Sequence, residues 1–442
     1  MFISKARTKA YPKFFDKEII CRFSGLASVG VFLMLALVPI GYLEAQDREP
    51  TASVLDVRNR THSEWSPLGV RGGGVLLHPS LEIGTVFDDN IYRHHQNKDS
   101  DTIYHVRPRI FGISQWSRHK LQFDAYIDSF DYAQADGEDT TNWFAGLNGR
   151  VDITRNAWLD ADLSFREQHE GRGSPESESR TLEPVSQTIA DLGIKATYRW
   201  NRFYLSVGGR YADREHENAI EARTNRVSIQ NDRDRNERQL SVEAGYDLSP
   251  GTDVFLRTTD FRHRYDQFED AEGNRRNSDG SEGVLGFRLD VGALVAAELF
   301  SGYRSQKYNN DPNLPEIDGV TYGVDLTWNP TALSTVRTTA SRKAYESALN
   351  RTSGYLSSQL NLSVDHELRR NILIGVGVGV STNKYYGTDR EDEIIQGNVQ
   401  AEWKINRNLQ TEAGLRLQQR NSNVPQSEYG RDSLYLSLRY SL

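Results

Sequence analysis

Apolar and polar residues alternate along almost the whole chain from Gly74 onward. At the carboxyl end, every second residue from Leu434 to Leu442 is Leu or Tyr, while Ser437 and Arg439 occupy two of the positions between them. A period of two places successive side chains on opposite faces of a β-strand, whereas a helical face repeats every 3.6 residues. The pattern predicts β-strands with one apolar face and one polar face.

About 18 such runs follow one another. They span about 74–90, 101–115, 119–134, 141–154, 157–170, 187–200, 203–216, 235–248, 252–267, 281–290, 293–308, 317–328, 332–346, 353–368, 372–386, 391–405, 408–421 and 430–442. Most are far longer than strands of soluble proteins, whose usual length is about 5–6 residues. Roughly ten residues of a tilted strand are enough to cross a bilayer, so these runs have the length of membrane-spanning strands.

The connections between runs are alternately short and long. Short ones include 155–156, 201–202 and 406–407, while longer charged ones include 171–186 and 217–234. Outer-membrane barrels have short periplasmic turns at one end and longer loops at the other, and their backbone groups pair only if the barrel closes. The sequence therefore predicts an all-β protein, a transmembrane up-and-down antiparallel β-barrel of about 18 strands, with 16 as the alternative count. A soluble propeller would show four-stranded repeat signatures, and none is visible.

The amino-terminal residues follow a different pattern. Six basic residues precede an apolar stretch at about 25–40, and Ala45 follows, which is the order of a secretory signal peptide. We therefore expect a signal peptide at 1–45, a periplasmic N-terminal segment at 46–72 and the barrel at 73–442. An uncleaved membrane anchor is the alternative for 1–45, and a partial plug of the barrel is the alternative for 46–70.

Composition narrows the class further. The one Cys precludes a disulfide scaffold or a four-Cys metal site, and the formal charge of −8 is unlike the basic surface of a nucleic-acid-binding protein. We expect no nucleic-acid partner. Removal of 1–45, which holds six basic and three acidic residues, would take the formal charge to −11.

The polar faces of the strands should line the lumen, and they carry charges of both signs. The charged residues that we place there are Asp124, Asp128, Arg150, Asp152, Asp160, Asp162, Arg166, Lys195, Arg199, Arg210, Glu402, Lys404, Glu412, Arg416 and Arg439. An 18-stranded barrel is wide enough to hold water. A mixed wall suits hydrated polar solutes, whereas a pore dedicated to anions would show charges of one sign. Pairing between neighbouring strands is the structural alternative for each charge.

Enzyme chemistry has little support. Neither a Gly-x-Ser-x-Gly elbow nor a His-Glu-x-x-His motif occurs. The cluster Asp88-Asp89-Asn90 has the chemistry of a cation site, but a strand-to-loop turn explains it equally well. We predict no catalytic residues, no metal site and no cofactor.

The opening of the barrel region is more specific than the rest. It joins a Gly-Val-Arg start, a Pro-Ser-Leu strand, an Asp-Asn turn, a second strand with Pro and a Trp-x-Arg-His turn. The motif residues are Arg71, Pro79, Ser80, Asp89, Asn90, Pro108, Trp116, Arg118 and His119. In this order they resemble the putative β-barrel porin 2 family, over about residues 67–442.

The resemblance implies an outer-membrane pore in a Gram-negative bacterium that exports a secreted polysaccharide of exopolysaccharide, capsule or holdfast type. Its implied partners are outer-membrane lipid, the polysaccharide and a periplasmic polysaccharide-export protein. Two alternatives stay open, a general or solute-specific diffusion porin and a structural or surface-binding barrel. A long loop folded into the lumen, with 171–186 and 217–234 as candidates, would favour the diffusion porin.

Overall fold

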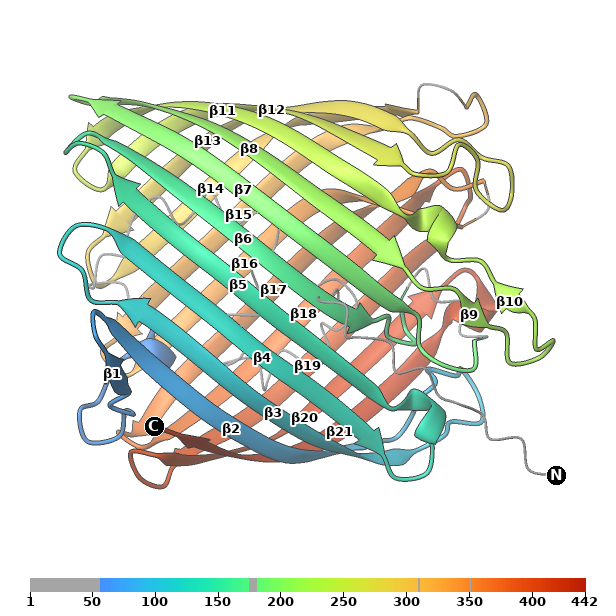
Figure 1. Ribbon diagram of the computed structural model, residues 1–442, viewed down its shortest axis with the longest axis horizontal. Helices are drawn as coiled ribbons and strands as arrows, with labels where there is room; N and C mark the ends of the chain where they lie inside the picture. The colour runs from blue at the N-terminus through green and yellow to red at the C-terminus, as the bar shows by residue number, and fades with distance from the viewer. Residues whose placement is uncertain (1–55, 175–180, 309–310, 350) are drawn as a thin grey trace.

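The structure, a computed structural model, is a closed β-barrel that describes residues 56–174, 181–308, 311–349 and 351–442. The predicted signal peptide and residues 46–55 lie outside the described residues. Figure 1 shows the barrel from the side, with long strands inclined to its axis. Among the described residues, no helix is long and apolar enough to cross a membrane.

Eighteen long antiparallel strands form the wall, as the alternation predicted. They are β2 (Val75–Asp88), β3 (Asp101–Ser114), β4 (Lys120–Tyr132), β5 (Thr140–Asp152), β6 (Ala157–His169), β7 (Ser186–Trp200), β8 (Phe203–His216), β11 (Arg235–Ser249), β12 (Thr252–Tyr265), β13 (Ser278–Val291), β14 (Val295–Tyr308), β15 (Ile317–Thr331), β16 (Ser334–Glu346), β17 (Gly354–Arg369), β18 (Ile372–Tyr386), β19 (Glu391–Lys404), β20 (Leu409–Ser422) and β21 (Tyr429–Ser441). The predicted all-β barrel and its count of 18 strands are confirmed.

The remaining elements are short. They are the strands β1 (Val70–Gly72), β9 (Ala219–Ile220) and β10 (Val227–Ser228), and the one-turn 3-10 helices η2 (Val57–Asn59), η3 (Asp136–Glu138), η4 (Asn231–Arg233) and η5 (Pro425–Ser427). β1 extends the short-turn end of the sheet by pairing with β2. β9 and β10 form a hairpin of their own within the long loop between β8 and β11, at the right of Figure 1.

The barrel closes where its first and last long strands meet. β2 pairs with β21 from Ser80 opposite Ser441 to Asp88 opposite Ser433. Closure leaves no open sheet edge, which would otherwise place unpaired backbone donors and acceptors in hydrocarbon. Both ends of this seam are therefore places where side chains are expected to reinforce the fold.

The convex face of the barrel is apolar. On β21, Leu434, Leu436 and Leu438 are 59%, 54% and 38% exposed, although these side chains are among the most hydrophobic in proteins. Trp328 and Trp403 are also exposed, close to the short turns, where amphipathic rings suit the edge of a bilayer. An exposed apolar band of this extent needs lipid around it.

Candidate functional site

The lumen is the candidate functional site, and every predicted lumen-lining charge lies on the polar face of its strand. On β4, Asp124 and Asp128 are buried while the adjacent Ile127 is exposed. Side chains from strands that are not neighbours can meet only on the concave side of a curved sheet. Arg288 of β13 reaches Tyr204 of β8 in this way, at 2.6 Å, which identifies the polar face as the inner one.

Within the described residues, at least nine of the fifteen predicted charges take part in ion pairs, six of them between neighbouring strands. The ion pairs that include predicted lumen residues are Arg109–Asp124, Arg107–Asp128, Arg150–Asp160, Arg210–Asp191, Arg199–Asp247, Lys404–Glu402 and Arg439–Glu82. The others lie on the same face: Asp152 and Asp162 on β5 and β6, Arg166 on β6, Lys195 on β7, and Glu412 and Arg416 on β20. Arg416 lies over the ring of Tyr435 (4.1 Å), whose hydroxyl donates to Glu412 at 3.1 Å. The wall is thus largely neutralised by its own side chains.

The partners Arg107 and Arg109 were not among the predicted lumen residues. They alternate with Val106, Pro108 and Ile110 along β3, so the same period of two would have placed them in the lumen. The proline interrupts the ladder here, because Val106 pairs with Ser129 and the next pair is Arg109 with Tyr126.

A network of five charges is centred on Arg288 near the short-turn ends of β11 to β14. Arg288 donates to Glu243 (2.8 Å) and to Glu298 (2.7 Å), and Arg257 donates to the other oxygen of Glu243 (2.8 Å). The ring of Phe255 lies 4.0 Å from the guanidinium carbon of Arg288 and 4.6 Å from that of Arg257. Asp253 also lies 3.5 Å from Arg288, so two arginines and three carboxylates surround one aromatic ring.

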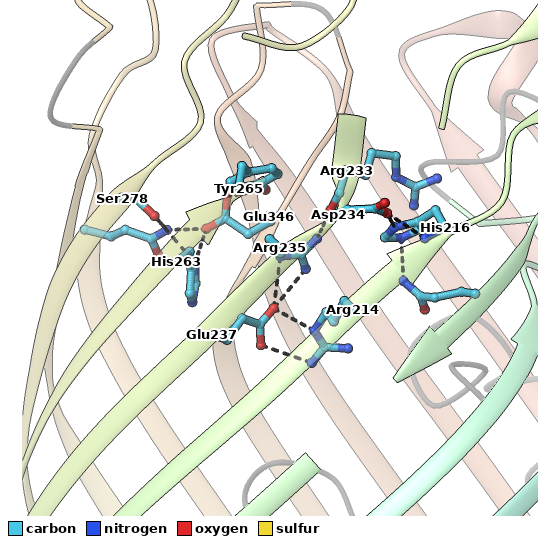
Figure 2. Close-up of polar contacts among 12 residues, drawn as sticks. Arg214, His216, Arg233, Asp234, Arg235, Glu237, His263, Tyr265, Ser278 and Glu346 are labelled. Atoms are coloured by element: carbon cyan, nitrogen blue, oxygen red, sulfur yellow. Dashed lines mark hydrogen bonds and ion pairs between the residues drawn. The ribbon is translucent and has the colours of Figure 1, made fainter. Parts of the chain in front are cut away.

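The outer end of the same wall is braced in a similar way, and Figure 2 shows this cluster. Arg214 of β8 donates two hydrogen bonds to Glu237 of β11 (2.7 and 3.1 Å), and Arg235 adds a third at 3.0 Å. Glu346 of β16 accepts from Tyr265 of β12 at 3.2 Å, across the three strands that separate β12 from β16. These contacts fix the shape of the outer mouth.

A cavity of about 310 Å³ opens beside this cluster, at the base of the loop between β8 and β11. Its lining consists of Thr188, Glu215, His216, Glu217, Asn218, Asn231 and Asp234. Asp234 Oδ1 accepts from the backbone N–H of His216 at 2.6 Å and lies 3.1 Å from its Nδ1. Burial, together with the nearby carboxylates of Glu215 and Asp266, raises the pKa of Asp234 to about 6.

The wall formed by β17, β18 and β19 is different, because its middle carries amides instead of charges. We call the inward side chains Gln359, Asn361, Gln396 and Asn398 the amide track; they flank Gly377 and Gly379 of β18. A Cβ atom at Gly377 would lie 2.4 Å from Asn398 Oδ1, and one at Gly379 would lie 2.5 Å from Asn361 Oδ1. The amides therefore lean over the two glycines.

Part of the amide track has unused hydrogen-bonding capacity. Gln396 is 8% exposed, and its Oε1 accepts no hydrogen bond from the described residues. Asn361 donates only a long bond, 3.4 Å, to Thr339. An amide presents both donors and an acceptor, so this surface can exchange partners with water or with hydroxyl groups of a solute.

Residues 56–60, from the predicted N-terminal segment, lie inside the short-turn end of the barrel. The N–H of Val57 donates to Thr335 Oγ1 at 2.9 Å, and the side chain of Arg58 reaches Asp365 of β17 at 2.6 Å. This position matches the alternative of a partial plug for 46–70, but the individual contacts could not be predicted from sequence, because the partners lie about 280–310 residues away.

The loop after β6 reaches across the outer mouth. The carbonyl of Gly173 accepts from Arg420 of β20 at 3.1 Å, although six strand-to-strand steps separate β6 from β20 around the closing seam. The buried Arg172 pairs with Glu138 of the loop after β4. The start of the predicted candidate loop 171–186 thus lies over the lumen; residues 175–180 lie outside the described residues.

Two family-motif residues hold the outer end of the closing seam. Asn90 is fully buried, and its side-chain amide donates to the carbonyls of His94 (2.8 Å) and Gly430 (2.9 Å). Asp89 Oδ1 accepts from the N–H of Asp432 at 2.7 Å. The adjacent Asp88 forms ion pairs with Arg93 and Arg431. The Asp-Asp-Asn cluster therefore joins the outer ends of β2 and β21.

The other motif residues lie at the opposite end. The carbonyl of Pro79, next to Ser80 on β2, accepts from the N–H of Leu442 at 3.1 Å. His119 Nδ1 accepts from the N–H of Asp152 at 3.2 Å, and Arg118 donates to the carbonyl of Ile153 at 2.8 Å, so one short turn is tied to the next. Trp116 lies against Gly74, Pro108 lies within β3, and Arg71 is exposed on β1. Pro79, Asp89 and Asn90 therefore contact the last strand or its final residue, whereas Arg118 and His119 join neighbouring short turns.

The family whose model matches this chain is described as Putative beta-barrel porin 2, and the match spans residues 63–442. The chain belongs to that family. It is therefore a porin-like outer-membrane barrel, and the family assignment from the opening motif is confirmed. No curated protein sequence matches the chain.

Solved structures with a similar shape include outer-membrane receptors and porins. The siderophore receptor PirA from Acinetobacter baumannii is 8% identical, with 83% of this chain and 80% of that chain covered, at a TM-score of 0.44. OpdK from Pseudomonas aeruginosa, solved with vanillate, is 11% identical (83% and 99%, TM-score 0.42). A BenF-like porin from Pseudomonas fluorescens Pf-5 is 9% identical (83% and 99%, TM-score 0.43). Similarities this low carry no information on function.

Proposed function

We propose that this barrel is an outer-membrane pore of a Gram-negative bacterium that exports a secreted polysaccharide. The observation that carries the proposal is the amide track, an uncharged strip of hydrogen-bonding side chains within a lumen whose charges largely neutralise one another. The association of this family with exopolysaccharide, capsule or holdfast export supplies the class of polymer.

The chemistry of the track suits a long hydrated chain. Sugar hydroxyls both donate and accept hydrogen bonds, as do the amides of Asn361 and Asn398. Transport requires binding that is weak and spread over many positions, because a single tight site would hold the polymer in place. Amide-to-hydroxyl bonds meet this requirement, since each one exchanges with an equivalent bond to water.

The proposed pore is a non-catalytic channel. Its partners are the lipid of the outer membrane around the apolar face, the polysaccharide in the lumen and a periplasmic polysaccharide-export protein at the short-turn end. The short turns tied together by Arg118 and His119 offer that protein a rigid rim.

A diffusion porin is the second candidate, and one observation favours it. The loop after β6 crosses the outer mouth and contacts β20 through Gly173 and Arg420. A loop over the lumen limits the size of the solutes that pass, which suits small molecules better than a polymer.

A matched pair of tryptophan variants tests the choice. Gly377→Trp projects into the lumen beside Asn398, whereas Gly397→Trp, on the next strand and paired with Val378, projects outward into open space. We expect Gly377→Trp and deletion of the gene to remove surface polysaccharide, measured by lectin or dye binding, while Gly397→Trp retains it. Heat-modifiable migration on gels confirms that each barrel has assembled.

The opposite result would favour the diffusion porin. In that case the deletion strain keeps normal surface polysaccharide and loses uptake of a small solute, and Gly377→Trp reproduces the uptake defect.

A further inference from the structure

The side chain of Arg58 occupies a site on the lumen wall near the short turns. Asp365, Gly375, Gln400 and Glu402 surround it, and we call this site the seat. Its Nε donates to Asp365 Oδ1 at 2.6 Å, and its Nη1 lies 3.7 Å from Glu402 Oε2. The side chains of Arg58 and Glu402 are each 2% exposed, and that of Asp365 is 10% exposed. The seat therefore excludes most water, which strengthens the attraction between the charges.

The floor of the seat is Gly375 of β18. A Cβ atom at this position would lie 2.4 Å from Arg58 Nη2 and 2.7 Å from Asp365 Oδ1. Any larger residue would occupy the space that the guanidinium group fills. Gln400, which pairs with Gly375 on β19, borders the other side with its amide nitrogen. The seat thus has the depth and the carboxylates needed for a planar cation.

Arg58 does not use the full capacity of the seat. Within the described residues, its Nη1 and Nη2 donate no hydrogen bond, and Glu402 Oε2 accepts none. The backbone explains this, because the neighbouring Val57 is fixed by its N–H to Thr335 and Asp56 is paired with Arg337. A guanidinium group that is not tethered can turn and approach both carboxylates at hydrogen-bond distance.

The seat is strongly acidic without Arg58. Asp365, Glu402 and Glu412 all attract Arg58. Lys404 also lies beside the seat, with its Nζ 3.7 Å from the second oxygen of Glu402. Removal of the N-terminal segment would leave the carboxylates of Asp365 and Glu402 without their arginine partner.

We propose that this seat is a lumenal binding site for a guanidinium group, and that Arg58 fills it as a ligand built into the chain. When residues 56–60 leave the lumen, the seat takes the guanidinium of a cationic solute in place of Arg58. The N-terminal segment therefore both narrows the short-turn mouth and neutralises its strongest cation site. This inference is independent of which solute the barrel transports.

The test uses the full chain reconstituted in planar bilayers, with guanidinium chloride added on the short-turn side and sodium chloride of equal concentration as the reference. We expect guanidinium to block the current through Arg58→Ala at a concentration at least about tenfold lower than the wild type requires, equivalent to about 1.4 kcal/mol. Arg58→Ala should also be more cation-selective by reversal potential. Arg60→Ala, whose arginine donates to the carbonyl of Ala332 across the rim, should behave as the wild type.

A second variant distinguishes the seat from a general change of the pore. Arg58→Ala with Gly375→Val removes the tethered ligand and fills the seat, so the block by guanidinium should disappear while cation selectivity remains. Arg58→Gln, which keeps most of the stem, replaces Arg58→Ala if the latter does not assemble. Equal block of the wild type and the Arg58 variant, or block that survives Gly375→Val, would overturn the proposal.

Discussion

The lumen has two walls of different character. Across β11 to β14, charged side chains bind one another in networks such as the one around Arg288, and the same is true of the pairs on β3 to β8. Across β17 to β19, uncharged amides lie over Gly377 and Gly379. The charged wall holds its strands together through ion pairs, whereas the middle of the amide wall carries hydrogen-bonding groups without charge.

The difference has a physical cause. A buried charge is costly unless it is paired, and many of the lumenal Arg and Asp side chains have a partner on a neighbouring strand. A neutral amide that lacks one hydrogen bond costs less free energy than an unpaired charge. It can therefore bind water or a sugar hydroxyl in turn. The charged wall therefore stabilises the shape of the barrel. The amide wall can form hydrogen bonds with a solute in the lumen.

The largest effect should follow from breaking the charged wall. Arg288→Met removes the cation that binds Glu243 and Glu298, and leaves both carboxylates under-compensated. Removal of one partner of a buried ion pair typically costs about 3–5 kcal/mol. We expect a loss of this size in the free energy of unfolding, measured by urea titration in lipid vesicles. A loss below about 1 kcal/mol would show that this wall is solvated and that the comparison of the two walls is wrong.

The next test concerns which face is the lumenal one. Leu438 on β21 points outward and Ser437 points inward. Leu438→Arg should lower the free energy of unfolding in a bilayer by about 2–4 kcal/mol if the site lies near the midplane. Ser437→Arg should cost less, because the lumen already holds charges such as Arg439. Equal losses in the two variants would mean that neither face is buried in lipid.

The walls themselves were predictable from sequence, because strand period alone assigns inside and outside. All the predicted charged residues, from Asp124 to Arg439, follow this rule. Their partners were less accessible to sequence reasoning, since pairing depends on register. The seat of Arg58 was out of reach, because Arg58 and Asp365 lie 307 residues apart and no local pattern connects them. The loop over the outer mouth could be named as a candidate, but its contact with Arg420 depends on closure of the barrel.

A smaller effect is expected on the amide wall. Asn398→Ala removes an inward side chain that leans over Gly377 and carries no charge. We expect a change of at most about 1 kcal/mol in the free energy of unfolding, since a neutral hydrogen bond contributes about that much. The free energies of unfolding of this variant and of Arg288→Met, measured under the same conditions, compare the two walls directly. If Asn398→Ala lowered the free energy of unfolding as much as Arg288→Met does, the amide track would have a structural role.

The smallest effect concerns pH at the outer mouth, where Asp234 accepts from the N–H of His216. The pKa of this carboxyl is raised from 3.8 to about 6, first by burial and then by Glu215 and Asp266, while Arg233 opposes the shift. The folded state therefore holds the proton more tightly than the unfolded state. Below about pH 4 both states are protonated, and as pH rises toward 6 the folded state loses stability relative to the unfolded one.

Asp234→Asn keeps an oxygen toward His216 and cannot ionise. The thermal midpoint of the wild type minus that of Asp234→Asn should fall between pH 4 and 6 and stay level above 6. A difference that rises over this interval would mean that Asp234 is stabilised in its charged form.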